Sequence, residues 1–187
     1  MKFLLQIIVL ILISTQTLLA QEKNKKKIVY INMSSFSILK NSDSYYTNYS
    51  KDSLRTNNGM GVDINTIHGI KLFGFVSLSI GMSFDWNINK TFLSTPLLYD
   101  VRFFSSKNLD NCFFAFLQTG QNIKWSSSFN GNGTTSKLGV GVIIKDSDSI
   151  SYFVNIFKKS KQIELMNFKD NGYYNSNGFG LSLGIIF

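Results

Sequence analysis

The chain has 187 residues, enough for one domain of ordinary size, and a formal net charge of +8. Its one cysteine, Cys112, and one histidine, His68, exclude an internal disulfide framework and a zinc site made of these residue types. The positive charge does not indicate nucleic-acid binding, because the lysines either form a polar run at 23–27 or are scattered, without a basic helix or an RNA-binding strand motif.

Residues 1–20 have the layout of a secretory signal peptide. Lys2 gives a positive start, an apolar stretch covers 3–13, and Ala20 offers a small residue for cleavage. This stretch is about half as long as the roughly 20 apolar residues that a membrane-spanning helix needs. We therefore expect the mature chain to consist of a polar lead-in at 21–27 and one barrel domain at 28–187.

From residue 28 onward the sequence predicts strands. Short segments rich in aromatic and β-branched residues alternate with period two, and Asn, Ser, Gly and Asp fill the gaps. In one segment, for example, Leu138 and Val140 share one face while Lys137 and Gly139 share the other. We expect eight such strands, at 28–39, 58–68, 73–86, 96–105, 112–124, 136–145, 149–159 and 177–187.

The gaps between these strands alternate in length. Short turns are expected at 69–72, 106–111 and 146–148, and long loops at 40–57, 87–95, 125–135 and 160–176. This alternation places the long loops at one end and both chain ends at the other. The predicted fold is therefore all-β, an eight-stranded antiparallel up-and-down barrel, which closes because an open sheet would expose its edge strands.

Two kinds of barrel fit this pattern: a soluble ligand-binding barrel of lipocalin type and a transmembrane barrel. The strands carry Gly and Ser together with a few charges on one face, and an apolar face about ten residues long, enough for a tilted strand to cross a bilayer. We therefore favour the transmembrane barrel, with aromatic girdles at Trp86 and Trp125 near the long loops and at Tyr152 and Phe187 near the other boundary. The predicted lumenal charge network comprises Asp63, Asp100, Arg102 and Lys137.

The chain resembles the small outer-membrane β-barrels of OmpA/OmpX type. The resemblance is carried by the leader, the eight alternating strands and a last strand that ends in phenylalanine, in the segments TPLLYDVRFF, FFAFLQTGQNIKW, KLGVGVIIK and GFGLSLGIIF. It implies an outer-membrane location, outer-membrane lipids as surroundings and the barrel-assembly machinery as a partner. In that family the machinery reads the last strand, so the implied assembly signal is Phe179, Leu181, Leu183, Ile185 and Phe187.

No catalytic constellation stands out. Some barrels of this architecture modify lipid A with a histidine, a serine and an acid near the outer leaflet, but His68 is expected at the short-turn end, out of reach of that leaflet. We predict a non-enzymatic protein without cofactor or metal, with a structural or surface-interaction role. A lipid A-modifying enzyme and a soluble lipocalin-like barrel remain alternatives. If the protein binds a surface ligand, the contacts are expected in the loops 40–57 and 160–176, which carry tyrosines and basic residues.

Overall fold

The computed structural model describes residues 28–48, 52–56, 58–89, 92–124, 132–145, 150–165 and 172–187. The predicted signal peptide at 1–20, the lead-in at 21–27 and Trp125 lie outside the described residues. Among the described ranges, no helix is long and apolar enough to cross a bilayer.

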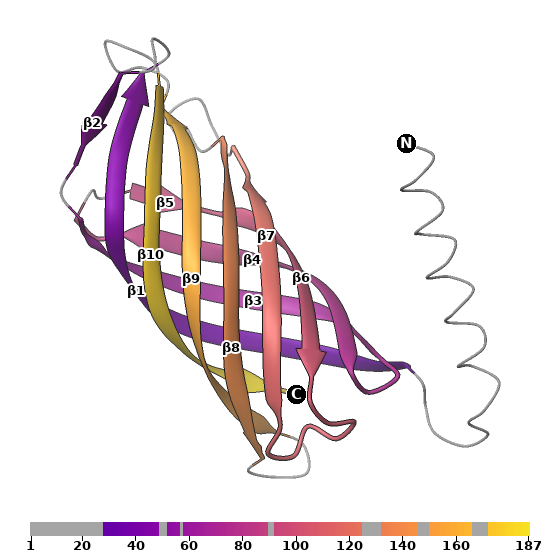
Figure 1. Cartoon of the computed structure of the whole chain (residues 1–187). Helices are drawn as coiled ribbons and strands as arrows, with labels where there is room; N and C mark the ends of the chain where they lie inside the picture. Colours follow the sequence, from indigo (N-terminus) through magenta and orange to yellow (C-terminus); the bar gives the residue numbers. More distant parts are fainter. Residues whose placement is uncertain are drawn as a thin grey trace, which may run out of the picture.

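The described strands form one closed antiparallel sheet (Figure 1). Each long strand pairs with its neighbours along the chain, and the last strand returns to pair with the first. The predicted eight-stranded up-and-down barrel is confirmed. Its strands are β1 (Ile28–Asn48), β3 (Met60–Leu72), β4 (Val76–Asn87), β6 (Pro96–Phe104), β7 (Phe113–Asn122), β8 (Gly133–Lys145), β9 (Ser151–Leu165) and β10 (Gly172–Ile186). Two short strands, β2 (Ser53–Arg55) and β5 (Phe92–Ser94), pair with β1 and β4.

The sheet closes with a stagger that tilts its strands. When paired residues are followed once around the barrel from Lys40, the path returns to β1 at Tyr30. Closure of the sheet therefore shifts the register along β1 by ten residues, from 40 to 30. The path passes through Phe179, Lys158, Leu138, Leu117, Val101, Leu78 and Ile70. Strands in such barrels run at about 35–45° to the barrel axis.

The two ends of the barrel differ, and we name them as they lie in Figure 1. The upper end carries the connections β1–β3, β4–β6, β7–β8 and β9–β10. The lower end carries the other three connections, the start of β1 and the terminal Phe187. At the lower end Phe187 exchanges two backbone hydrogen bonds of 3.1 Å with Asn32.

The predicted strand ends are wrong in several places. β1 continues through the first half of the predicted loop 40–57, and β9 and β10 continue into the predicted loop 160–176. These polar stretches remain extended because β10 pairs with both β1 and β9 there, as in the pairs Tyr46–Tyr174 and Tyr174–Ile163. The predicted gap 87–95 likewise contains β5. The upper β9–β10 connection, 166–171, is consequently shorter than the lower β6–β7 connection, 105–112.

The turn between β3 and β4 also differs from its predicted position at 69–72. The ladder of these strands continues to the pair Leu72–Val76, so the turn lies at 73–75 and β4 begins three residues later than predicted. Phe73 and Gly74 have φ of 52° and 80°. Glycine adopts this left-handed conformation without steric cost, whereas Phe73 must be held in it by the short turn.

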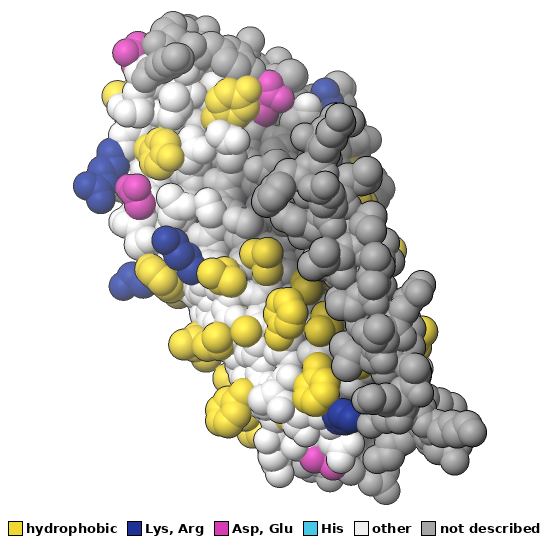
Figure 2. Space-filling view, turned by 45° about the vertical axis from the view of Figure 1, so that its right-hand side comes forward, with side chains coloured by type: hydrophobic (Ala, Val, Ile, Leu, Met, Phe, Trp, Pro, Cys, Tyr) yellow, Lys and Arg dark blue, Asp and Glu magenta, His cyan; other side chains and the backbone are white. Residues whose placement is uncertain are grey.

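The two faces of the sheet have opposite character. In β7, Phe113 and Leu117 are 69% and 53% exposed, while Phe114 and Phe116 between them are 3% and 4% exposed. Hydrophobic side chains on the outside gather in a belt over the lower and middle part of the barrel, with charged side chains mainly above it (Figure 2). The inside holds both buried charges and buried rings. This distribution is the reverse of a soluble barrel, so the lipocalin-like alternative does not fit the fold.

Candidate functional site

The upper lumen contains a cluster of five charged side chains, which we call the upper ion cluster: Asp63, Asp85, Lys137, Lys159 and Lys161. All five are buried. Lys159 Nζ lies 2.7 Å from Asp63 Oδ2 and 2.6 Å from Asp85 Oδ2. Lys137 Nζ lies 2.9 Å from the same Asp63 oxygen, and Lys161 Nζ lies 2.8 Å from Asp85 Oδ2. Strands β3, β4, β8 and β9 are thus connected across the lumen by alternating charges.

A second charged group lies on β6. Arg102 Nε donates a hydrogen bond of 2.8 Å to Asp100 Oδ1, and Gln118 Nε2 from β7 donates one of 3.1 Å to Asp100 Oδ2. The guanidinium carbon of Arg102 also lies 5.2 Å and 4.9 Å from the ring centroids of Phe114 and Phe116. Such contacts stabilise a cation that has lost its water.

The structure divides the four residues predicted as one lumenal network between these two groups. Asp63 pairs with Lys137, and Asp100 pairs with Arg102. The prediction omits Asp85, Lys159 and Lys161. The period-two pattern already puts Asp85 on the Ser and Gly face of its strand, but Lys159 and Lys161 lie where the predicted strand ends and the predicted loop begins.

The lower lumen is filled by aromatic rings. Four phenylalanines are buried there, and the Phe114 ring lies at their centre: its centroid is 5.9–6.2 Å from those of Phe104, Phe116 and Phe153. Inward glycines make room for rings: a Cβ atom on Gly141 would fall on Phe114, and one on Gly184 would fall on Phe153. The small residues of the inner face therefore accommodate phenylalanines as well as charges.

His68 lies on β3 and points outward in the lower part of the barrel. The Tyr30 hydroxyl is 2.6 Å from its Nδ1, and Asn32 Nδ2 is 3.0 Å from the same atom. The Tyr30 and His68 rings are stacked, with centroids 6.3 Å apart. In the described part of the chain, no group of three or more His, Cys, Asp or Glu residues could hold a metal ion.

The five residues of the predicted assembly signal lie on the outward face of β10 or just after it. Their side chains are exposed on the barrel surface: Phe179, Leu181, Leu183, Ile185 and Phe187. Phe187 stands at the lower boundary of the belt, as does Tyr152 on β9, whereas Trp86 on β4 stands near the upper boundary.

The described tyrosines and the described arginine of the two predicted ligand-binding loops lie on strands. Tyr45 and Tyr46 belong to β1, Tyr173 and Tyr174 to β10, and Arg55 to β2. Lys161 is buried in the upper ion cluster. Tyr49, Lys51 and Lys169 lie outside the described residues.

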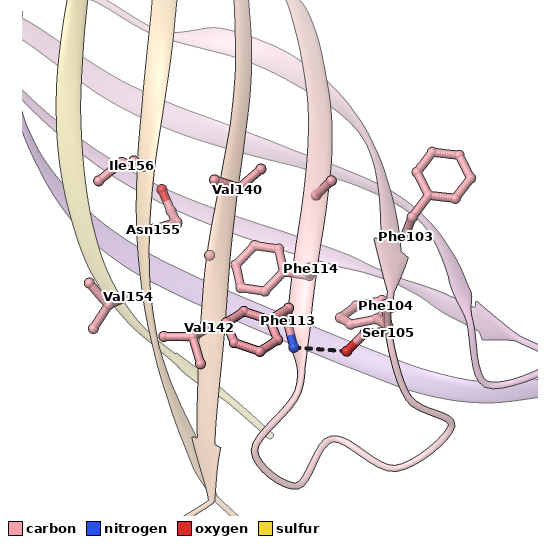
Figure 3. Close-up of a pocket in the computed structure, with 12 residues that line it drawn as sticks. Phe103, Phe104, Ser105, Phe113, Phe114, Val140, Val142, Val154, Asn155 and Ile156 are labelled. Atoms are coloured by element: carbon pink, nitrogen blue, oxygen red, sulfur yellow. Dashed lines mark hydrogen bonds between the residues drawn. The ribbon is translucent and has the colours of Figure 1, made fainter.

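Apolar grooves cross the outer surface. One is lined on β6, β7, β8 and β9 by residues that include Phe103, Phe113, Val140, Val142 and Val154 (Figure 3). At its lower end the backbone N–H of Phe113 donates a hydrogen bond of 3.0 Å to Ser105 Oγ. Because the groove is open and apolar, it suits hydrocarbon chains better than a water-soluble substrate.

The barrel geometry is similar to that of solved outer-membrane proteins. Neisserial surface protein A shares 8% sequence identity with this chain, with a TM-score of 0.51 over 84% of this chain and 99% of that one. The chain has the fold of a small outer-membrane β-barrel. The N-terminal β-barrel domain of Pseudomonas aeruginosa OprF shares 13% identity, with a TM-score of 0.38 over 84% of this chain and 97% of that one. No protein-family model and no curated protein sequence matches the chain.

Proposed function

We propose that this protein is a non-enzymatic integral protein of the outer membrane, which anchors its upper rim at the cell surface and contributes to the envelope. The observation that carries the proposal is the inverted barrel, with an apolar belt outside and ion clusters and phenylalanine rings inside. Lipid is the solvent that favours this arrangement, since every backbone group of the belt pairs within the closed sheet.

The proposed orientation follows from the two ends. A signal peptide directs the chain through the inner membrane, and the barrel-assembly machinery inserts it by binding β10. The lower end, with the start of β1 and Phe187, then faces the periplasm. The upper rim then faces outward. In β1 and β10 this rim carries the tyrosines Tyr45, Tyr46, Tyr173 and Tyr174, which supply amphipathic contact area for a surface ligand.

The location is tested by cell fractionation combined with gel migration. We expect the protein in the outer-membrane fraction, and we expect it to migrate faster before heating than after, because a closed barrel resists dodecyl sulfate. Recovery in the soluble periplasmic fraction without detergent would contradict the proposal.

The enzymatic alternative, modification of lipid A, is not favoured by the position of His68. Its imidazole lies in the lower part of the barrel and contacts Tyr30 and Asn32, whereas an outer-leaflet acyl ester would lie near the upper boundary of the belt. Mass spectrometry of lipid A from cells with and without the gene is expected to give the same acyl profile. A defined acyl-chain difference that His68→Ala abolishes would reverse this preference.

A further inference from the structure

An apolar groove on the outer surface ends at two lysines. It has a volume of about 840 Å³ and is formed by outward side chains of β1, β7, β8, β9 and β10. Ala115 forms a low point in it, between the bulkier Phe103 and Val140 of the neighbouring strands. The lining includes Ile38, Ala115, Leu138, Val140, Ile156 and Leu181, with Lys40 and Lys158 at the upper end.

These two lysines are unusual within the barrel. The other Lys, Arg and Asp side chains described in the lower and middle parts of the strands are buried inside, whereas Lys40 and Lys158 point outward where the belt gives way to polar residues. No ion pair or hydrogen bond joins either ammonium group to another described residue. Two uncompensated charges at the edge of a hydrocarbon layer are costly unless they reach an anion there.

The register brings Lys40 and Lys158 to the two sides of one aromatic residue. Lys40 pairs with Phe179, and Phe179 pairs with Lys158. Neighbouring strands are about 4.8 Å apart, so the two lysine Cα atoms are about 10 Å apart. Their flexible stems can extend upward along the apolar surface, and both ammonium groups can approach one anionic group above Phe179.

We infer that this groove binds a lipid of the outer leaflet, with an acyl chain between β1 and β7 and a phosphate held by Lys40 and Lys158. This inference rests on the proposed location and orientation, which place the upper boundary in the outer leaflet. The lipid of that leaflet that combines phosphate with several acyl chains is lipid A. Basic groups at the headgroup level are the usual protein partners of such phosphates.

Native mass spectrometry of the folded barrel in non-ionic detergent tests the inference. Wild-type protein should bind added bisphosphorylated lipid A in preference to its dephosphorylated form. The double variant Lys40→Gln/Lys158→Gln should bind bisphosphorylated lipid A on the order of 10- to 30-fold more weakly, since each basic group near the headgroups contributes a several-fold effect. Unchanged affinity in that variant, equal binding of the dephosphorylated lipid, or preference for phosphatidylglycerol would overturn the assignment.

Matched variants separate charge, shape and folding. Lys124→Gln removes an exposed lysine beyond the end of β7, outside the groove, and should bind like wild type. Lys40→Arg/Lys158→Arg keeps both charges and should retain binding. Ala115→Phe fills the low point of the groove without changing charge and should weaken binding several-fold, and unchanged affinity would exclude this groove as the acyl site.

Gel migration separates failure of the lipid site from failure of the proposed outer-membrane location. Heat-modifiable migration shows whether each variant is a closed barrel before lipid is added. If the wild-type protein forms a closed barrel but does not bind lipid A, only the lipid site is contradicted. If it stays soluble without detergent, the proposed location is contradicted.

Discussion

Lys159 holds a central position in the upper ion cluster, because its ammonium group contacts the carboxylates of both Asp63 and Asp85. The free energy lost when buried charges leave water offsets much of their mutual attraction, so the cluster is weak evidence for high stability. It is nevertheless sensitive to the loss of one member. Removing a partner leaves another charge in the lumen without full compensation.

We predict that Lys159→Met lowers the free energy of unfolding by about 3 kcal/mol, the loss expected when one partner of a buried ion pair is removed. Lys137 and Lys161 would each remain beside one carboxylate, so the barrel should still close. Urea unfolding of refolded protein in detergent measures the change. Lys124→Met, at an exposed lysine, is the control and should have little effect; a similarly small effect of Lys159→Met would show that the lumen solvates these charges itself.

Inward glycines of the lower barrel pack against phenylalanine rings. A Cβ atom on Gly184 would fall on the Phe153 ring and near the backbone carbonyl oxygen of Ser34, whereas one on Gly61 would lie 3.3 Å from its nearest neighbour, the Trp86 carbonyl oxygen. Gly184→Ala should therefore cost about 1–3 kcal/mol, as overpacking does in protein cores. Gly61→Ala should cost less in the same unfolding experiment. Equal losses would mean that the ring of Phe153 moves aside freely.

The sequence predicts which strands exist and which face each strand turns inward. Leu138 and Lys137 can be assigned to opposite faces because the side chains of a strand alternate with period two. The strand ends could not be predicted in the same way. Residues 40–48 show no apolar alternation, and 160–165 show it only at Ile163 and Leu165. Both stretches are extended because neighbouring strands offer them backbone partners, which is a property of the assembled sheet.

The last strand carries the prediction on assembly. Phe187 is exposed at the lower end of β10, and its side chain makes no contribution to the lumen. We predict that Phe187→Asp reduces the amount of heat-modifiable barrel in cells while the purified variant still refolds in detergent. Phe75→Asp, at an exposed position in the β3–β4 turn of the same end, is the control. Normal cellular levels of the Phe187 variant would show that the terminal residue is not an assembly signal.

Side chains occupy the interior of the barrel over the height of the belt. Phenylalanine rings occupy the lower lumen, and the upper ion cluster lies above them. The sequence does not predict the ion pairs of the upper ion cluster. Alternation alone directs Asp63 and Lys137 inward, but their contact depends on the register of strands on opposite sides of the barrel. That register follows from the stagger of the closed sheet.

A filled lumen predicts a barrel that does not conduct. Eight strands enclose a space just wide enough for side chains, so no continuous water path is expected. Protein reconstituted into planar bilayers should show negligible current at moderate voltage. Protein-free detergent at the same dilution is the control, and large, stable single-channel steps would mean that the interior side chains rearrange in the bilayer.

Closure between β1 and β10 has a kinetic consequence. It joins Met33 to Ile186, which are 153 residues apart in the sequence, so it cannot begin before the last strand has been synthesised. Contacts between residues so far apart in the sequence form slowly, because the chain loses much conformational entropy before the new contacts stabilise it. Until then β1 and β10 each have an unpaired edge, and such edges lead to aggregation unless they are shielded from other chains.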